Sequence, residues 1–191
     1  MEVKVDFGKA VSESWAIEKT NMVLAIVATL AASAVGVLTL CICLGGLMAG
    51  LMGVFLRLHD KDAATPQIGD VFGGFKYTLP GFVLTLVGGS GFLLCGVGAL
   101  VTLPLMFLAL IRLADTGNTE GCGIAVLKEV IEQVKKSGWM VCLWMLVAGI
   151  LVDVGMLLCG IGVLVTAPLG FLTMVAVYRQ LFPKGGQPVA A

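Results

Sequence analysis

Cys95-Gly96-Val97-Gly98-Ala99-Leu100-Val101-Thr102 and Cys159-Gly160-Ile161-Gly162-Val163-Leu164-Val165-Thr166 are two copies of one apolar segment. A third copy, Cys43-Leu44-Gly45-Gly46-Leu47-Met48-Ala49-Gly50, aligns with both without a gap. A phenylalanine follows each cysteine at the same distance, at Phe55, Phe107 and Phe171. The chain is therefore internally repeated, and we expect one domain over 1–191 with repeats at approximately 5–59, 67–114 and 122–182.

The composition is typical of a membrane protein. Of the 191 residues, 59% are hydrophobic and 13% are charged, and the mean hydropathy is +1.04. A water-soluble domain could not bury this much apolar surface. The formal net charge is zero, which gives no reason to expect a nucleic-acid partner. Membrane lipids are the expected surroundings of the chain.

Basic residues are confined to particular parts of the sequence. All twelve lysines and arginines lie near the termini or in the segments 57–76 and 112–136. The stretches 20–56, 77–111 and 137–178 contain none. Each stretch is long enough for two helical crossings of about 20 residues. We therefore expect three helical hairpins, with the repeated Cys-Gly segment near the tip of each.

This interpretation predicts six membrane helices, at about 22–40, 43–57, 79–95, 97–113, 139–157 and 159–180. An even number of crossings places both termini on one side, and the positive-inside rule makes that side the cytoplasm. The localisation that follows is the inner, cytoplasmic membrane. The second and third helices are short for a full crossing, so complete crossing and shallow insertion both stay open for these hairpins.

An amphipathic segment precedes each hairpin. Its apolar residues recur at helical spacing in three groups: Phe7, Val11 and Trp15; Ile68, Val71, Phe72 and Phe75; Ile124, Leu127, Val130, Ile131 and Val134. Such helices are expected to lie along the cytoplasmic membrane interface, although the third could equally cap the bundle. The predicted fold is thus an all-α polytopic membrane helix bundle, with three repeats of an interfacial amphipathic helix and a transmembrane hairpin.

Small residues stand four positions apart at corresponding places in the three repeats. The pairs are Gly46 and Gly50, Gly98 and Thr102, and Gly162 and Thr166. This spacing lets helix backbones approach closely in lipid. We expect these six positions to be helix-packing sites, and we expect self-association into a homo-oligomer or a place in a membrane-protein complex.

Part of the chain resembles a known group of proteins. The run Gly46 to Gly50 leads to Arg57, then to Asp60-Lys61-Asp62 and Ile68-Gly69-Asp70-Val71-Phe72-Gly73-Gly74-Phe75. This order is similar to that of uncharacterised bacterial multi-pass proteins, which resemble the membrane domain of glycerophosphodiester phosphodiesterases and carry a comparable G-D-x-F-x-G-F stretch. The resemblance covers the first half of the chain and the later Cys-Gly segments. It implies fold and location only, because the phosphodiesterase chemistry belongs to a separate soluble domain.

Few residues suggest chemistry. Asp153 is the only carboxylate in the three stretches without basic residues, and an intramembrane carboxylate suggests a functional polar site. It also lies close to the predicted outer tip, where it could face water or cap a helix. His59 is expected to be a solvated loop residue, and Asp115-Thr116-Gly117 is expected to end a helix.

The cysteines leave several possibilities open. Cys43, Cys95 and Cys159 occupy equivalent repeat positions and could meet beside Cys41 as a thiolate cluster or a disulfide. No Cys-x-x-Cys pair is present, and a buried cysteine commonly acts as a small hydrophobic residue. We therefore predict no catalytic residue, no metal site and no cofactor.

Two classes of function remain. The first is a non-catalytic integral membrane scaffold or accessory subunit, which self-associates, seats a membrane complex or shapes the bilayer. The second is a small channel or transporter with Asp153 in its pathway. The scarcity of polar side chains inside the predicted hairpins favours the first class.

Overall fold

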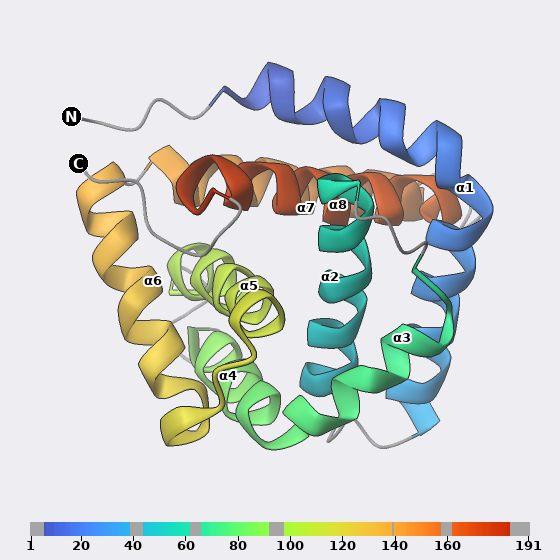
Figure 1. Cartoon of the computed structure of the whole chain (residues 1–191). Helices are drawn as coiled ribbons and strands as arrows, with labels where there is room; N and C mark the ends of the chain where they lie inside the picture. Colours follow the sequence, from blue (N-terminus) through green and yellow to red (C-terminus); the bar gives the residue numbers. More distant parts are fainter. Residues whose placement is uncertain are drawn as a thin grey trace.

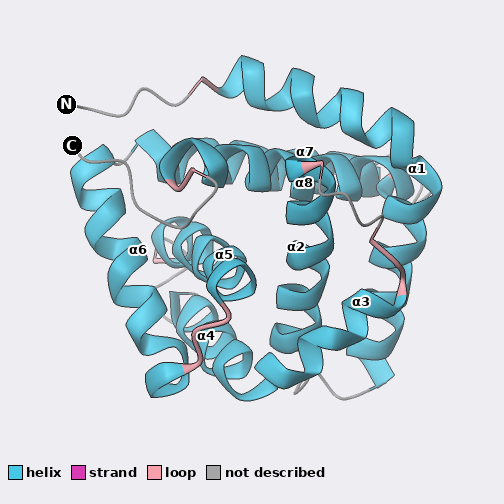
Figure 2. Cartoon of the chain, viewed as in Figure 1, coloured by secondary structure: helices cyan, strands magenta, loops and turns pink. Residues whose placement is uncertain are grey.

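A computed structural model describes residues 6–38, 44–61, 66–91, 98–138, 140–157 and 162–183, with the side chains of 33–38, 153–157 and 163–164 left out. Every regular element in these ranges is a helix (Figure 2). The predicted all-α membrane fold is confirmed. Cys41, Cys43, Cys95 and Cys159 lie outside the described residues, so the thiolate cluster and the disulfide stay untested.

Six of the helices correspond in position to the six predicted membrane helices (Figure 1). They are α1 (Phe7–Leu38), α2 (Leu44–Asp60), α4 (Thr78–Ser90), α5 (Ala99–Thr116), α7 (Met140–Leu157) and α8 (Val163–Leu181). Between them lie α3 (Gly69–Phe72), the 3-10 helices η1 (Gly73–Tyr77) and η3 (Glu120–Gly123), and α6 (Ile124–Ser137). Consecutive helices α1 and α2, α4 and α5, and α7 and α8 contact each other as the predicted hairpins require.

Three helical stretches are long and apolar enough to cross a membrane. They are Phe7–Ala32, Gly69–Ser90 and Ala99–Thr116. A fourth would arise if Glu120–Ser137 and Met140–Val152, which meet at 110°, formed one broken span. Helix α2 has 17 residues, which is short for a crossing, as its sequence already indicated. Six complete crossings stay a prediction.

Helix α1 contains the first amphipathic segment as well as the first apolar helix. The two parts meet at a kink at Asn21, whose backbone is not helical (φ −121°, ψ 26°). The kink falls one residue before the predicted start of the membrane helix at 22. The first part lies along α8 (Figure 1), and Phe7 stacks on Trp144 of α7 with ring centroids 4.7 Å apart. Tertiary packing therefore covers the beginning of this segment.

The other two amphipathic segments differ in what they cover. In α6, Val126, Val130 and Val134 are buried, and the helix contacts α5. This arrangement is the alternative in which the third segment caps the bundle. In α3 and η1, by contrast, Phe72 and Phe75 remain exposed, as an interfacial position would require.

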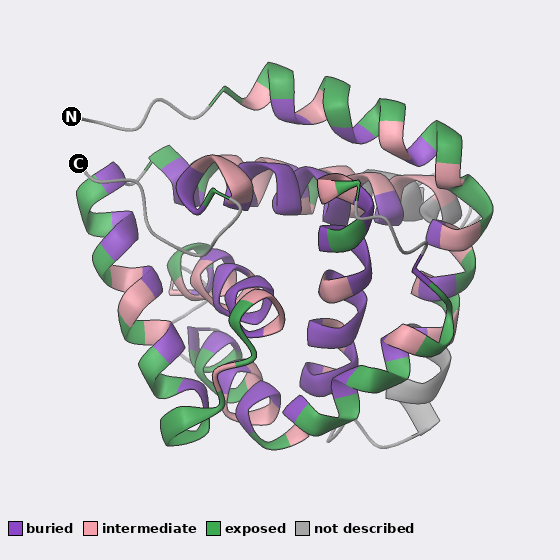
Figure 3. Ribbon diagram, in the orientation of Figure 1, coloured by how far each residue is buried: buried purple, intermediate pink, exposed green. Residues whose placement is uncertain are grey.

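The second helices of the three hairpins form the centre of the molecule. Helices α2, α5 and α8 contact one another, and their inner faces are largely buried (Figure 3). The repeated phenylalanines meet there: the ring centroids of Phe55 and Phe171 lie 6.2 Å apart, and those of Phe107 and Phe171 lie 6.4 Å apart. Aromatic pairs at this separation contribute packing energy beyond their buried area. Corresponding positions of the three predicted repeats thus meet in one shared core.

Two hairpins share an equivalent interhelical hydrogen bond. The hydroxyl of Thr102 donates to the carbonyl oxygen of Gly88 at 2.8 Å, and that of Thr166 donates to the carbonyl oxygen of Val152 at 3.4 Å. Gly98 and Gly162 precede the first turns of α5 and α8. The carbonyl oxygens of these glycines accept N–H bonds from Thr102 and Thr166. These four predicted positions therefore lie where α5 and α8 begin.

The glycine face of α2 is occupied by the same chain. A Cβ at Gly46 would lie 2.9 Å from Cα of Thr78, and a Cβ at Gly50 would lie 3.0 Å from Cα of Gly74 and closer still to the carbonyl oxygen of Val71. Such distances show backbone-to-backbone contact between α2 and the η1–α4 segment. The Gly46 and Gly50 face is therefore not available to a second copy of the protein, so any self-association must use another surface.

Candidate functional site: a polar cavity at the ends of the central helices

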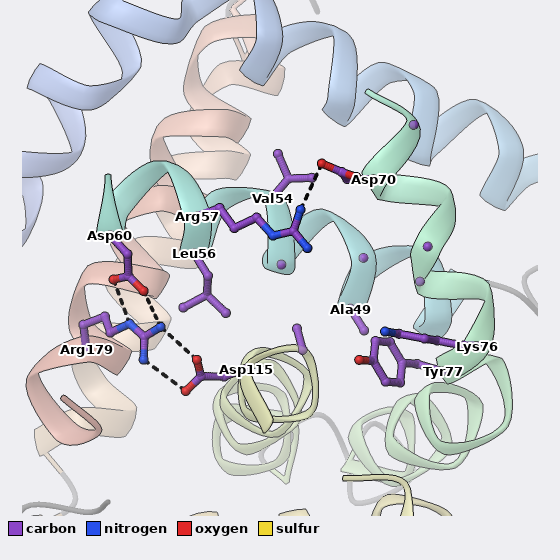
Figure 4. A pocket seen from close by; sticks show the side chains of 16 residues that line it. Ala49, Val54, Leu56, Arg57, Asp60, Asp70, Lys76, Tyr77, Asp115 and Arg179 are labelled. Carbon is purple, nitrogen blue, oxygen red and sulfur yellow. Dashed lines mark hydrogen bonds and ion pairs between the residues drawn. The ribbon is translucent and has the colours of Figure 1, made fainter. Parts of the chain in front are cut away.

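A cavity of about 440 Å³ lies between α2, α3, η1, α5 and α8 (Figure 4). Small residues make room for it: Gly50, Gly53, Gly69, Gly73, Gly74, Ala49 and Ala114. Six charged side chains line it: Arg57, Asp60, Asp70, Lys76, Asp115 and Arg179. Concave sites of about 300–1,000 Å³ commonly hold small molecules. The cavity is therefore the candidate site of the protein.

The ends of the three central helices supply one side of the cavity. Asp60 is the last residue of α2, and Arg179 lies in the last turn of α8. Helix α5 ends just after Asp115, where Gly117 adopts a left-handed conformation (φ 67°) and its N–H donates to the carbonyl oxygen of Leu113 at 2.9 Å. This ending confirms the terminator predicted from Asp115-Thr116-Gly117. Helix termination thus places both carboxylates beside the same arginine.

Arg179 joins the two carboxylates through four hydrogen bonds. Its Nε and Nη2 donate to Asp60 at 3.0 and 2.6 Å, and its Nη1 and Nη2 donate to Asp115 at 3.0 and 2.8 Å. The side chains of Arg179, Asp60 and Asp115 are only 9%, 9% and 15% exposed. Paired, charge-assisted bonds of this kind are the strong ones. They connect α2, α5 and α8 at one point.

Arg112 extends this cluster towards α6. Its guanidinium donates from Nε to Glu129 at 3.2 Å and lies 3.8 Å from Asp115. The buried hydroxyl of Tyr178 accepts a hydrogen bond from Arg112 at 3.4 Å and donates one to Asp115 at 2.7 Å. The result is a chain of alternating charge, which we call the ion cluster: Asp60, Arg179, Asp115, Arg112 and Glu129.

The opposite side of the cavity is richer in positive charge. Arg57 donates to Asp70 at 3.1 Å, and both side chains remain partly exposed. The ammonium group of Lys76 lies 4.7 Å from the centre of the Tyr77 ring. In the part of the chain that the structure describes, no carboxylate pairs with Lys76. This side therefore carries two cationic groups and one carboxylate.

The expectation for His59 was wrong. Helix α2 continues to Asp60, so His59 lies in its last turn rather than in a solvated loop, and its side chain is only 17% exposed. Its Nδ1 is 3.5 Å from Asp60 and its Nε2 is 3.9 Å from Glu13. The imidazole packs behind the ion cluster and does not line the cavity.

Asp153, the one polar site expected inside the hairpins, belongs to α7. Its side chain lies outside the described residues, so the expected polar site stays a prediction. The ion cluster, in contrast, was missed by sequence reasoning. A signal was present, because Asp115 and Arg179 stand at the same distance from their repeated cysteines, and so do Asp60 and Arg112. Opposite charges at equivalent positions indicate that the repeats meet there.

The charged groups that line the cavity are largely paired with one another. Its carboxylates accept hydrogen bonds from guanidinium groups, and its lining includes no serine, threonine, cysteine or histidine side chain. Among the described residues, no group of three His, Cys, Asp or Glu side chains is placed to hold a metal ion. Comparisons with known protein families, curated proteins and solved structures find no match.

Proposed function

We propose that the protein is a non-catalytic scaffold or accessory subunit of the cytoplasmic membrane. The observation that carries this proposal is the outer surface of the helices. Large apolar side chains are exposed there on α1, α4 and α7, including Val23 (76%), Leu79 (62%) and Ile150 (58%). Soluble monomers rarely expose continuous apolar surface of this kind. Lipid or an apolar partner would cover it.

The two ends of the described chain lie close together, which supports placing both termini on the same side of the membrane. The N–H of Asp6 donates to the side-chain oxygen of Gln180 at 2.8 Å, and the side-chain amide of Gln180 donates back to the carbonyl oxygen of Asp6 at 3.1 Å. The positive-inside rule assigns this side to the cytoplasm. The proposed protein therefore returns to its starting side after its last helix.

Self-association in this proposal uses the exposed apolar faces and not the glycine face of α2. The charged groups of the ion cluster are engaged with one another within the chain. They hold the central helices together while the outer helices meet lipid or a partner. No observation on the described residues favours a channel or transporter through Asp153.

The assembly state tests the proposal. Native mass spectrometry of the protein in lipid nanodiscs is expected to show two or more copies together, and cross-linking in the source membrane is expected to give the same stoichiometry. Single copies in both measurements, combined with ion flux in reconstituted vesicles that Asp153→Asn abolishes, would overturn the scaffold proposal in favour of the transporter.

Accessibility of Cys122 tests the membrane orientation. This cysteine is exposed in the connection between α5 and α6, which the proposal places in the cytoplasm. In a variant whose other five cysteines are alanine, a membrane-impermeant maleimide should label inverted vesicles and spare intact cells. A matched variant that keeps only buried Cys142 should react after denaturation alone. Labelling of Cys122 in intact cells would contradict the orientation.

A further inference from the structure

The charges around the cavity are separated into two unequal groups. On the α2–α5–α8 side, Asp60 and Asp115 share Arg179. This side therefore has one more carboxylate than guanidinium groups. Arg112 and Glu129 do not change that difference, because the whole ion cluster has three carboxylates and two guanidinium groups. On the opposite side, Arg57 of α2 pairs with Asp70, and Lys76 of η1 adds a second cationic group. The cavity therefore has a negative side and a positive side, which Figure 4 shows apart.

We propose that the cavity binds a zwitterionic aminophosphate group, with the phosphate beside Arg57 and Lys76 and the ammonium group beside Asp60 and Asp115. A simple anion would meet the negative side, and a simple cation would meet the positive side. A ligand with both charges matches both. The carboxylates bound by Arg179 keep the capacity to accept from an ammonium group, because each ionised carboxylate has about four acceptor positions.

Space and hydrogen-bonding groups for the phosphate are present on the positive side. At Gly69 and Gly73, no atom lies within 4 Å of the place a Cβ would occupy, so the wall is open there. Arg57 uses only Nη1 towards Asp70 in the hydrogen bonds of the described residues. Its remaining N–H groups and the Lys76 ammonium group can donate to phosphate oxygens.

The surroundings of the positive side favour a lipid as the source of this group. Phe72 and Phe75 lie on the same short segment as Gly73 and Lys76, and they are 38% and 42% exposed. Their rings stack with centroids 6.2 Å apart. Aromatic side chains of interfacial helices sit at the boundary between headgroups and acyl chains. A phospholipid could therefore place its headgroup in the cavity and its chains against these rings.

Lipid retention measured by native mass spectrometry tests the site. The protein is equilibrated in nanodiscs that contain equal amounts of phosphatidylethanolamine and phosphatidylglycerol, which share the phosphodiester and differ in the amine. We expect wild-type protein to retain phosphatidylethanolamine about tenfold more, the usual effect of one charge-assisted hydrogen bond. Equal retention of the two lipids, or preference for phosphatidylglycerol, would overturn the proposal.

Two variants separate the site from the fold. Lys76→Met removes a cation without a carboxylate partner among the described residues, so it should lower the retention of both lipids, which share the phosphate, and leave the unfolding midpoint unchanged. Lys128→Met, on the exposed face of α6, should change neither. Undiminished lipid retention by Lys76→Met would also overturn the proposal. The assembly state should be unaffected by Lys76→Met, so failure of this inference is distinct from failure of the scaffold proposal.

A soluble probe identifies the source of the ligand. Glycerophosphoethanolamine has the same zwitterion without acyl chains and is titrated against the protein in detergent by calorimetry. Weak binding beside strong lipid retention supports the lipid source. Lys76-dependent binding that is as tight as lipid retention supports the aminophosphate site and assigns it to a soluble ligand.

Discussion

Gly50→Leu is expected to prevent the native packing of α2 and to destabilise the protein by more than about 3 kcal/mol, the upper range for an overfilled core. The cause is geometric: even a Cβ at this position would lie 3.0 Å from the backbone of Gly74 and closer to Val71. Backbone atoms cannot move aside as the end of a flexible side chain can. Loss of helical circular dichroism during SDS titration in mixed micelles measures the effect.

Gly53→Ala is the matched control on the same helix. The nearest atom to a Cβ at Gly53 is Cβ of Ala114 at 3.8 Å, an ordinary van der Waals contact. Because alanine has the higher helix propensity, this variant should unfold at the same or a higher SDS fraction. Equal behaviour of Gly50→Leu and wild type would show that α2 does not pack against η1 as described.

Arg179→Met is expected to cost about 3–5 kcal/mol, because it leaves Asp60 and Asp115 as buried charges without their shared partner. Both carboxylates are largely covered, so water that reaches them from the cavity replaces the guanidinium only in part. The same SDS titration measures the loss. A proteolysis assay should show earlier cleavage in the connection that follows α5.

Two further variants distinguish the loss of a buried charge partner from a general loss of stability. Lys9→Met breaks an exposed i,i+4 pair with Glu13 and should change stability by less than about 1 kcal/mol. Asp60→Asn and Asp115→Asn added to Arg179→Met should restore part of the lost stability, because no unpaired charge then remains. A fully stable Arg179→Met protein would contradict the structural role of the ion cluster.

Much of the helical plan could be predicted from the sequence. The basic residues located the hairpins, since charges are excluded from apolar spans. The first helix was expected to start at 22, beside the observed kink at Asn21. The left-handed Gly117 ends α5 as its residue type indicated. Each of these features depends on residues that are close together in the sequence, so a single sequence is enough to predict it.

The cavity could not be predicted in the same way. Asp60, Asp115 and Arg179 come from three different repeats, and only the packing of α2, α5 and α8 brings them together. Small-residue spacing predicted that α2 approaches another backbone, but it did not identify the partner. That partner is the η1–α4 segment of the same chain, because its own glycines, Gly74 and Gly81, complement those of α2.

The charges of the ion cluster also bear on how such a chain could arise. Asp60 and Arg112 occupy one position of the repeat, and Asp115 and Arg179 occupy another. A symmetric trimer of identical hairpins would place three like charges together at each of these positions, and like charges in a covered site repel strongly. The alternating cluster thus depends on different residues at these positions in the three segments. A single polypeptide allows each segment to carry its own charge at these positions.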